Sequence, residues 1–113
     1  MAIKFESKEN DNGSVTLKIR GEIDMNSSPE TREVLTSLFD KSNKGIVVDL
    51  SGVEYIDSSG IATLVEGLQW SHKSKNKFRL ASLTPEVKDI FEIARLLTIF
   101  EIFDSPEEAL KGI

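Results

Sequence analysis

The sequence predicts a single α/β domain, a mixed and mainly parallel β-sheet packed with about four helices. An antiparallel hairpin comes first, because two stretches with period-two alternation, 3–8 and 15–20, flank the turn Asp11-Asn12-Gly13. Strand-like and helix-like segments alternate after it, which is typical of parallel strands joined by right-handed crossovers. The 113 residues suffice for one core, so we expect one domain spanning 1–113.

Three helices are predicted to begin at a repeated pattern of a hydroxyl residue, a proline and a glutamate. The pattern occurs at Ser28-Pro29-Glu30, Thr84-Pro85-Glu86 and Ser105-Pro106-Glu107. The hydroxyl residue caps the helix, proline suits the first helical position, and the carboxylate favours the positive end of the helix dipole. We therefore expect the hydroxyl residue of each pattern to be the N-cap.

Further strands are predicted at 45–50, 78–83 and 99–103. Ile46-Val47-Val48 is a near-continuous apolar run, as expected for a central strand buried on both faces. A short loop should follow Leu50, and the longest helix should then begin around Asp57-Ser58-Ser59-Gly60. Four apolar residues at i, i+3, i+4 and i+7 predict the face that this helix turns to the core: Ile61, Leu64, Val65 and Leu68.

Charge and composition exclude several classes of function. The net charge is −5, and the only basic concentration, Lys73, Lys75 and Lys77, lies at a predicted helix end, where cations favour the dipole. Nucleic acid and anionic membranes are therefore not expected as partners. The sequence has no long apolar run and no signal-peptide order, so we expect a cytoplasmic protein. Because it has no cysteine and no metal-ligand cluster, we expect neither a metal nor another cofactor.

The residues Asp57 to Gly60 should lie at the carboxyl end of a strand, where functional groups of α/β sheets gather. Plain capping is one interpretation of them; we expect Ser58 both to cap the helix and to present an oxygen for chemistry. Gly60 costs about 1 kcal/mol of helix propensity and allows another backbone to come close. A catalytic serine is disfavoured because Gly-x-Ser-x-Gly is missing. The only histidine, His72, lies roughly 21 Å further along the helix, on its apolar side. We expect no enzyme.

Three motifs resemble the STAS domain of bacterial anti-sigma-factor antagonists, and the resemblance covers nearly the whole chain. They are Gly21-Glu22-Ile23-Asp24, Val47-Val48-Asp49-Leu50-Ser51-Gly52-Val53 and Asp57-Ser58-Ser59-Gly60-Ile61. The resemblance implies that an anti-sigma serine kinase phosphorylates Ser58 and that a metal-dependent serine phosphatase removes the phosphate. It also implies that the unphosphorylated form binds the kinase and makes it release its other client, usually a sigma factor. Asp24 should lie beside Ser58 and Asp57, whereas Ala62 departs from the glycine of many members and narrows the space for a partner.

Phosphorylation of Ser58 should change recognition and leave the fold intact. A phosphoserine brings about −1.5 to −2 charges, which free N–H groups at a helix N-terminus accept. A partner shaped for a neutral hydroxyl would then bury an unpaired dianion beside carboxylates. Trp70 lies opposite the apolar stripe and is interpreted either as a docking residue or as packing against a neighbouring segment. The predicted partner-binding residues are Asp24, Asp57, Ser58, Ser59, Gly60, Ala62, Thr63, Glu66 and Trp70.

The sequence thus predicts a phosphorylation-switched binding module, an anti-sigma-factor antagonist that is a monomer when free. The alternative is a non-switching STAS subunit that scaffolds a larger complex, such as a transporter. The intact Asp57-Ser58 pair favours the switch.

Overall fold

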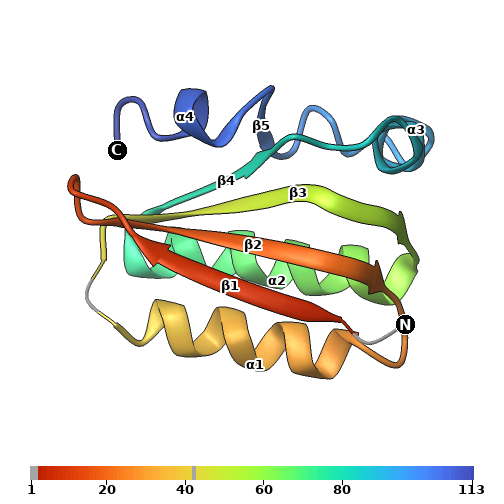
Figure 1. Ribbon diagram of the computed structural model, residues 1–113, viewed down its shortest axis with the longest axis horizontal. Helices are drawn as coiled ribbons and strands as arrows, with labels where there is room; N and C mark the ends of the chain where they lie inside the picture. The colour runs from red at the N-terminus through yellow and green to blue at the C-terminus, as the bar shows by residue number, and fades with distance from the viewer. Residues whose placement is uncertain (1–2, 42) are drawn as a thin grey trace.

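The computed structural model describes residues 3–41 and 43–113, and this part of the chain forms one five-stranded sheet with four helices. The strand order is β1-β2-β3-β4-β5; β1 is antiparallel to β2, and the other neighbours are parallel (Figure 1). The predicted fold class and the N-terminal hairpin are confirmed. The elements are β1 (Lys4–Glu9), β2 (Ser14–Ile23), α1 (Ser28–Phe39), β3 (Gly45–Ile56), α2 (Ser58–Ser74), β4 (Lys77–Ala81), α3 (Pro85–Ile93), β5 (Glu101–Phe103) and α4 (Pro106–Ala109).

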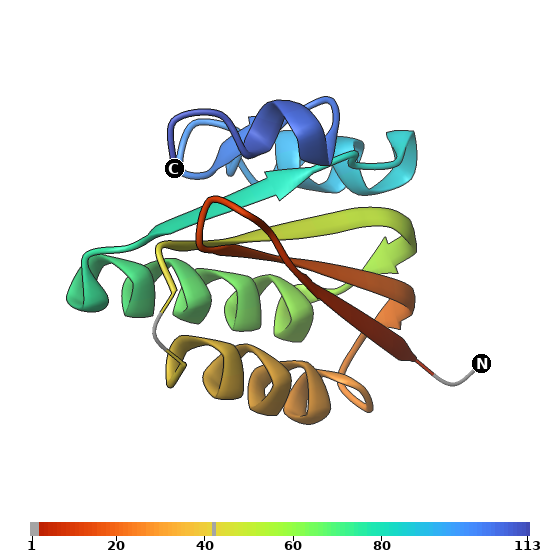
Figure 2. The ribbon, with the colours of Figure 1, turned by 60° about the vertical axis from the view of Figure 1, so that its left-hand side comes forward.

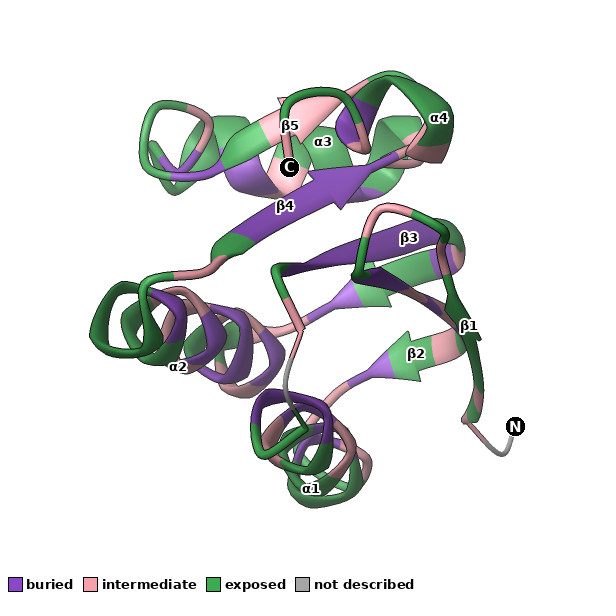
Figure 3. Cartoon of the chain, turned by 90° about the vertical axis from the view of Figure 1, so that its left-hand side faces the viewer, coloured by how far each residue is buried: buried purple, intermediate pink, exposed green. Residues whose placement is uncertain are grey.

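The helices lie on both sides of the sheet. α1 and α2 run side by side along one face, and α3 and α4 lie on the other side, as Figures 1 and 2 show. The larger core fills the space between the sheet and the helices, with Leu17, Val48 and Leu80 fully buried. β3 and β4 are buried along most of their length, whereas β1 is an exposed edge (Figure 3). A smaller cluster of Val47, Ala81 and Ala109 lies between the sheet and α4.

β3 is longer than predicted, because the expected loop after Leu50 is part of the strand. The strand continues to Ile56 and stays paired with β2 through two register shifts, each of which accommodates one extra residue of β3, the first at Leu50-Ser51 and the second at Glu54. Gly52 permits this close pairing, since a Cβ there would lie 2.9 Å from the Cγ of Arg20. The consequence is that β2 and β3 end side by side, with Ile23 opposite Ile56.

The predicted caps of α3 and α4 are confirmed. The Thr84 hydroxyl accepts the N–H of Val87 at 3.4 Å, and the Ser105 hydroxyl accepts the N–H of Glu108 at 3.2 Å. The other two predicted strands are shorter than expected: β4 ends at Ala81, where Ser82 turns into the left-handed region, and β5 covers only Glu101–Phe103.

α1 begins one residue earlier than predicted, so Ser27 and not Ser28 is its N-cap. The cause is a turn closed by the Asp24 carboxylate, which accepts the N–H groups of Asn26 and Ser27. The Ser27 hydroxyl donates to the carbonyl oxygen of Glu22. Ser28 becomes the first helical residue, and its hydroxyl is available for contacts with the neighbouring loop.

The buried face of α2 consists mainly of small residues, although all four residues of the predicted apolar stripe pack against the core as expected. Leu64 is fully buried, but the other three predicted core residues are only half-buried: Ile61, Val65 and Leu68. Gly60, Thr63, Gly67 and Ser71 complete the buried face. Large side chains of the sheet fill the space instead; a Cβ on Gly67 would lie 2.9 Å from the Cζ of Phe78. The helix therefore packs close to the sheet.

Candidate functional site

The candidate site is formed where the loop after β2 meets the loop after β3. Both strands end at the same edge of the sheet because they are parallel neighbours. The N–H of Asp57 donates to the carbonyl oxygen of Ile23 at 3.1 Å. In the opposite direction, the N–H of Met25 donates to Oδ2 of Asp57, also at 3.1 Å. Two loops that are distant in sequence are thus joined at the start of α2.

Asp57, and not Ser58, caps α2. The Asp57 backbone is extended, and its Oδ1 accepts the N–H of Ser59 at 2.9 Å and that of Gly60 at 3.1 Å. Ser58 follows as the first residue of the helix. The predicted cap was one residue too late because only a side chain one position before the helix reaches these N–H groups.

The Asp57 carboxylate is held in its charged form. The hydrogen bond from the Ser59 hydroxyl is the main cause that lowers the pKa of Asp57. Partial burial acts in the opposite direction, and the N–H groups of Gly60, Met25 and Ser59 lower the pKa further. The net pKa lies below the usual aspartate value, so the start of α2 carries a fixed negative charge at neutral pH.

The two serines at the start of α2 differ in how their hydroxyl groups are used. The Ser59 hydroxyl donates to Oδ1 of Asp57 at 2.6 Å and lies 3.0 Å from the hydroxyl of Ser28. Ser58 is exposed, and within residues 3–41 and 43–113 its hydroxyl makes no hydrogen bond. Ser58 therefore presents a free oxygen to solvent, whereas the oxygen of Ser59 is already engaged.

Fewer N–H groups at the helix start are free to receive a phosphate than the sequence predicts. Asp57 accepts those of Ser59 and Gly60 with its side chain and that of Ile61 with its carbonyl oxygen. A phosphate on Ser58 would lie in solvent beside the Asp57 carboxylate. The helix dipole still favours the charge of the phosphate, but the N–H groups of Ser59 and Gly60 already donate to the Asp57 carboxylate.

Asp24 joins this site through its backbone. Its carboxylate closes its own turn, and its carbonyl oxygen accepts the Ser28 hydroxyl at 2.7 Å. The Ser28 hydroxyl in turn meets Ser59, which donates to Asp57. A continuous chain of polar contacts therefore links the Asp24 carbonyl oxygen to the Asp57 carboxylate.

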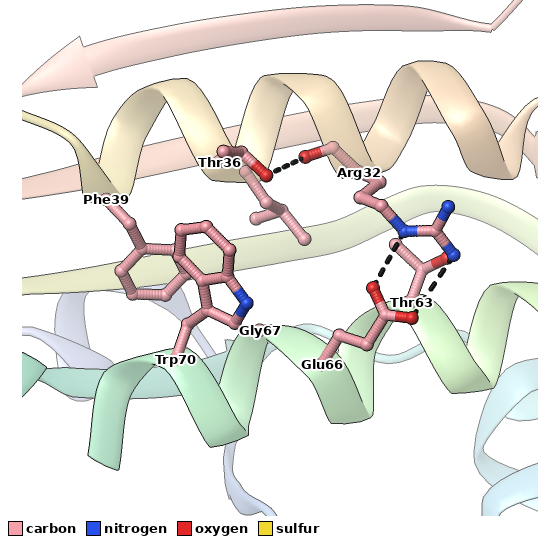
Figure 4. A pocket seen from close by; sticks show the side chains of 8 residues that line it. Arg32, Thr36, Phe39, Thr63, Glu66, Gly67 and Trp70 are labelled. Carbon is pink, nitrogen blue, oxygen red and sulfur yellow. Dashed lines mark hydrogen bonds and ion pairs between the residues drawn. The ribbon is translucent and has the colours of Figure 1, made fainter. Parts of the chain in front are cut away.

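Three of the predicted partner-binding residues lie in the groove between α1 and α2 (Figure 4). Thr63 is buried there and donates to the carbonyl oxygen of Ser59, so it cannot join an exposed patch. Glu66 forms a two-pronged ion pair with Arg32, at 2.7 and 3.2 Å. Trp70 packs against Phe39 with ring centroids 6.1 Å apart, and 40% of it stays exposed.

Gly60 is also buried and contributes no side chain to a surface. A Cβ at this position would lie 2.6 Å from the carbonyl oxygen of Ile23, which confirms that the glycine allows a close backbone approach. Ala62, by contrast, is exposed one helical turn after Ser58. The exposed part of the predicted set at the start of α2 is therefore Ser58 and Ala62.

Sequence reasoning missed Met25 and Ser28. Met25 is 75% exposed, and its N–H binds the Asp57 carboxylate. The available signal was its position, an apolar residue in a loop directly after Gly21-Glu22-Ile23-Asp24. Ser28 was interpreted only as a cap, so its contact with Ser59 could not be foreseen.

The described residues contain no group of three His, Cys, Asp or Glu side chains that could hold a metal ion. No helix in this part of the chain is long and apolar enough to cross a membrane. His72 is exposed in the last turn of α2, so its predicted place on the apolar side is wrong.

An α/β domain that begins with a hairpin and carries an Asp-Ser junction after its central strand is a STAS-like domain. The STAS domain family model matches residues 4–109, and the chain belongs to this family. An anti-sigma-B factor antagonist of Listeria monocytogenes is 30% identical over 102 residues, which cover 90% of this chain and 90% of the relative.

Two solved structures have the same fold. The crystal structure of an anti-sigma factor antagonist from Mycobacterium paratuberculosis superposes with a TM-score of 0.89 at 23% identity, covering 99% of this chain and 94% of that one. The Bacillus cell fate determinant SpoIIAA in its phosphorylated form gives a TM-score of 0.72 at 17% identity, covering 95% and 96%.

Proposed function

We propose that this chain is an anti-sigma-factor antagonist whose binding to an anti-sigma serine kinase is switched off by phosphorylation of Ser58. The observation that carries the proposal is the contrast between a free, exposed Ser58 hydroxyl and an engaged Ser59 hydroxyl at the capped start of α2. The name of the Listeria relative supports the antagonist role. The phosphorylated form of SpoIIAA supports modification as the means of control.

The switch would act through local charge. A phosphate on Ser58 adds about −1.5 to −2 charges beside the Asp57 carboxylate, whose N–H partners it cannot share. A kinase surface that closes over a neutral hydroxyl would then bury an unpaired dianion. A loss of roughly 2–4 kcal/mol of binding free energy weakens a complex about 30- to 1,000-fold, which suffices for partner exchange.

The fold would tolerate the modification because Ser58 is exposed and its hydroxyl supports no other contact in the described residues. The partners in this scheme are the kinase and a serine phosphatase that restores the binding form. The antagonist itself acts as a monomeric binding protein in the cytoplasm and catalyses no reaction.

The test is phosphorylation by the anti-sigma serine kinase of the same organism with ATP, followed by intact-mass and fragment mass spectrometry. We expect one phosphate, on Ser58. Ser58→Ala should gain none and should bind the kinase with or without ATP, whereas Ser58→Asp should bind weakly. Ser59→Ala is the matched control and should still be modified. A phosphate on Ser59, or equal affinity of modified and unmodified protein, would overturn the switch; equal affinity is what the scaffold alternative requires.

A further inference from the structure

Met25 combines high exposure with a fixed backbone. Its side chain is 75% exposed, in the loop between β2 and α1. An isolated exposed apolar side chain is common and needs no explanation. What distinguishes Met25 is that its N–H binds the carboxylate of Asp57, the residue directly before Ser58. The loop that carries Met25 is thus tied to the candidate phosphorylation site.

The Asp57 carboxylate divides its two oxygens between the two loops. Oδ1 accepts the Ser59 hydroxyl and the N–H groups of Ser59 and Gly60, whereas Oδ2 accepts the N–H of Met25. The Asp24 carboxylate fixes the rest of the loop. Held from both sides, the backbone at Met25 keeps its side chain in solvent.

The start of α2 supplies little apolar surface of its own. Its exposed positions, Ser58 and Ala62, are small, while Ile61 is half-buried and Leu64 is fully buried. A protein that closes over Ser58 therefore finds its bulky apolar contact at Met25. Methionine suits this role because its flexible thioether adapts to the partner's pocket, and methionine is enriched at protein interfaces.

We propose that Met25 is the apolar anchor of the surface that docks the kinase, and that Asp57 is the positioning residue that holds it beside Ser58. This inference rests on the proposed function and assigns it a specificity-determining residue. The kinase would offer an apolar pocket next to the groove that receives Ser58. Met25 and the start of α2 belong to one surface because the Asp57 carboxylate is hydrogen-bonded to both.

The first test compares kinase affinity, measured by titration calorimetry with ADP present, for three variants of the full chain. Met25→Gln keeps the length of the side chain and removes its apolar character; it should weaken binding about tenfold or more. Met25→Leu should stay within about twofold of the parent protein. Ile93→Gln is the matched control, since Ile93 is 84% exposed on α3 and is not hydrogen-bonded to the site. All three substitutions are at exposed positions and should leave the melting temperature nearly unchanged.

The second test asks whether Asp57 acts through Met25. Asp57→Asn preserves a good N-cap, but its amide group would direct a donor at the N–H of Met25. We expect weaker kinase binding and a changed amide chemical shift at Met25. The double variant with Met25→Gln should be no weaker than the weaker single variant. Additive losses would overturn the positioning role of Asp57.

The two proposals fail in different ways. If the parent protein gains no phosphate on Ser58, the proposed function is wrong. If Ser58 is modified and controls binding, but Met25→Gln binds as tightly as the parent protein, only the role of Met25 is wrong. Equal weakening by Ile93→Gln would also overturn it, because the effect would not be specific to this loop.

Discussion

Ser28 and Ser59 are 31 residues apart in the sequence, yet their hydroxyl oxygens lie 3.0 Å from each other. Each hydroxyl also reaches into its own loop: Ser28 donates to the carbonyl oxygen of Asp24, and Ser59 donates to the carboxylate of Asp57. The pair therefore brings the loop after β2 into contact with the start of α2, and it engages the hydroxyl of Ser59 but not that of Ser58.

Ser59→Ala should lower the free energy of unfolding by about 1–2 kcal/mol, because it removes a hydrogen bond to a charged carboxylate and the contact with Ser28. Ser58→Ala is the matched control and should change it by less than about 0.5 kcal/mol. Urea denaturation followed by circular dichroism measures both. Equal losses of unfolding free energy for the two variants would contradict the conclusion that the Ser59 hydroxyl is engaged and the Ser58 hydroxyl is not.

Gly60→Ala should destabilise the fold by about 3 kcal/mol even though alanine favours a helix. The new Cβ would lie 2.6 Å from the carbonyl oxygen of Ile23 and 2.6 Å from Cγ1 of Ile56, and backbone cannot easily move away. Gly67→Ala is the comparison, since its nearest neighbour is the Phe78 ring at 2.9 Å, which can tilt. We expect it to cost about 1 kcal/mol. A smaller loss for Gly60→Ala than for Gly67→Ala, in thermal melts, would contradict the tight packing.

Acid should remove the contribution of Asp57 to stability. Its pKa is lower in the folded protein than in the unfolded chain. The stabilisation is therefore fully present above the unfolded pKa, about 3.9, and is lost as the pH falls through the folded pKa. The gap in unfolding free energy between the parent protein and Asp57→Asn should be constant at neutral pH and should narrow below about pH 4.

Urea titrations of both proteins at a series of pH values measure this gap. Ser59→Ala serves as the control, since it removes the main contact that lowers the pKa of Asp57 and should shrink the acid-dependent part. If this difference in unfolding free energy stays independent of pH below about pH 4, the charge of the Asp57 carboxylate does not contribute to stability.

Trp70→Ala should lower the free energy of unfolding by about 1–2 kcal/mol, less than the roughly 3–5 kcal/mol of a fully buried tryptophan. The reason is that Trp70 packs against Phe39 while 40% of it stays exposed. Trp70→Phe should recover most of the loss. Because the chain has only one tryptophan, unfolding must be followed by circular dichroism. Kinase affinity of the same variants, corrected for the folded fraction, tests the predicted contact; an unchanged value would assign Trp70 to packing alone.

Most of the fold could be predicted because its signals are local. The Asn12-Gly13 turn specified the hairpin, and the prolines marked three helix starts to within one residue. The errors arose where tertiary contacts override local pattern. Ser51-Gly52 looks like a loop, but pairing with β2 keeps it in a strand. The small residues of α2 have low hydrophobicity, yet they are buried because large side chains of the sheet, such as Phe78, pack against them.

The candidate site could be located from the Asp57-Ser58-Ser59-Gly60 junction, since a strand end followed by a helix start is visible in sequence. The roles of its residues could not be separated in the same way. Whether Asp57 or Ser58 caps α2 depends on a one-residue difference in the helix start. Met25 and Ser28 join the site only because β2 and β3 end next to each other, which no local pattern encodes.

The joining of the two loops has a consequence for newly made or heat-damaged chains. Met25 and Ser58 lie 33 positions apart and are brought together in the folded protein by the completed sheet, the Asp57 carboxylate and the contact between Ser28 and Ser59. A kinase that requires both would pass over a chain that has not yet folded. Only folded molecules would then be phosphorylated, so the phosphorylated fraction would never include unfolded chains.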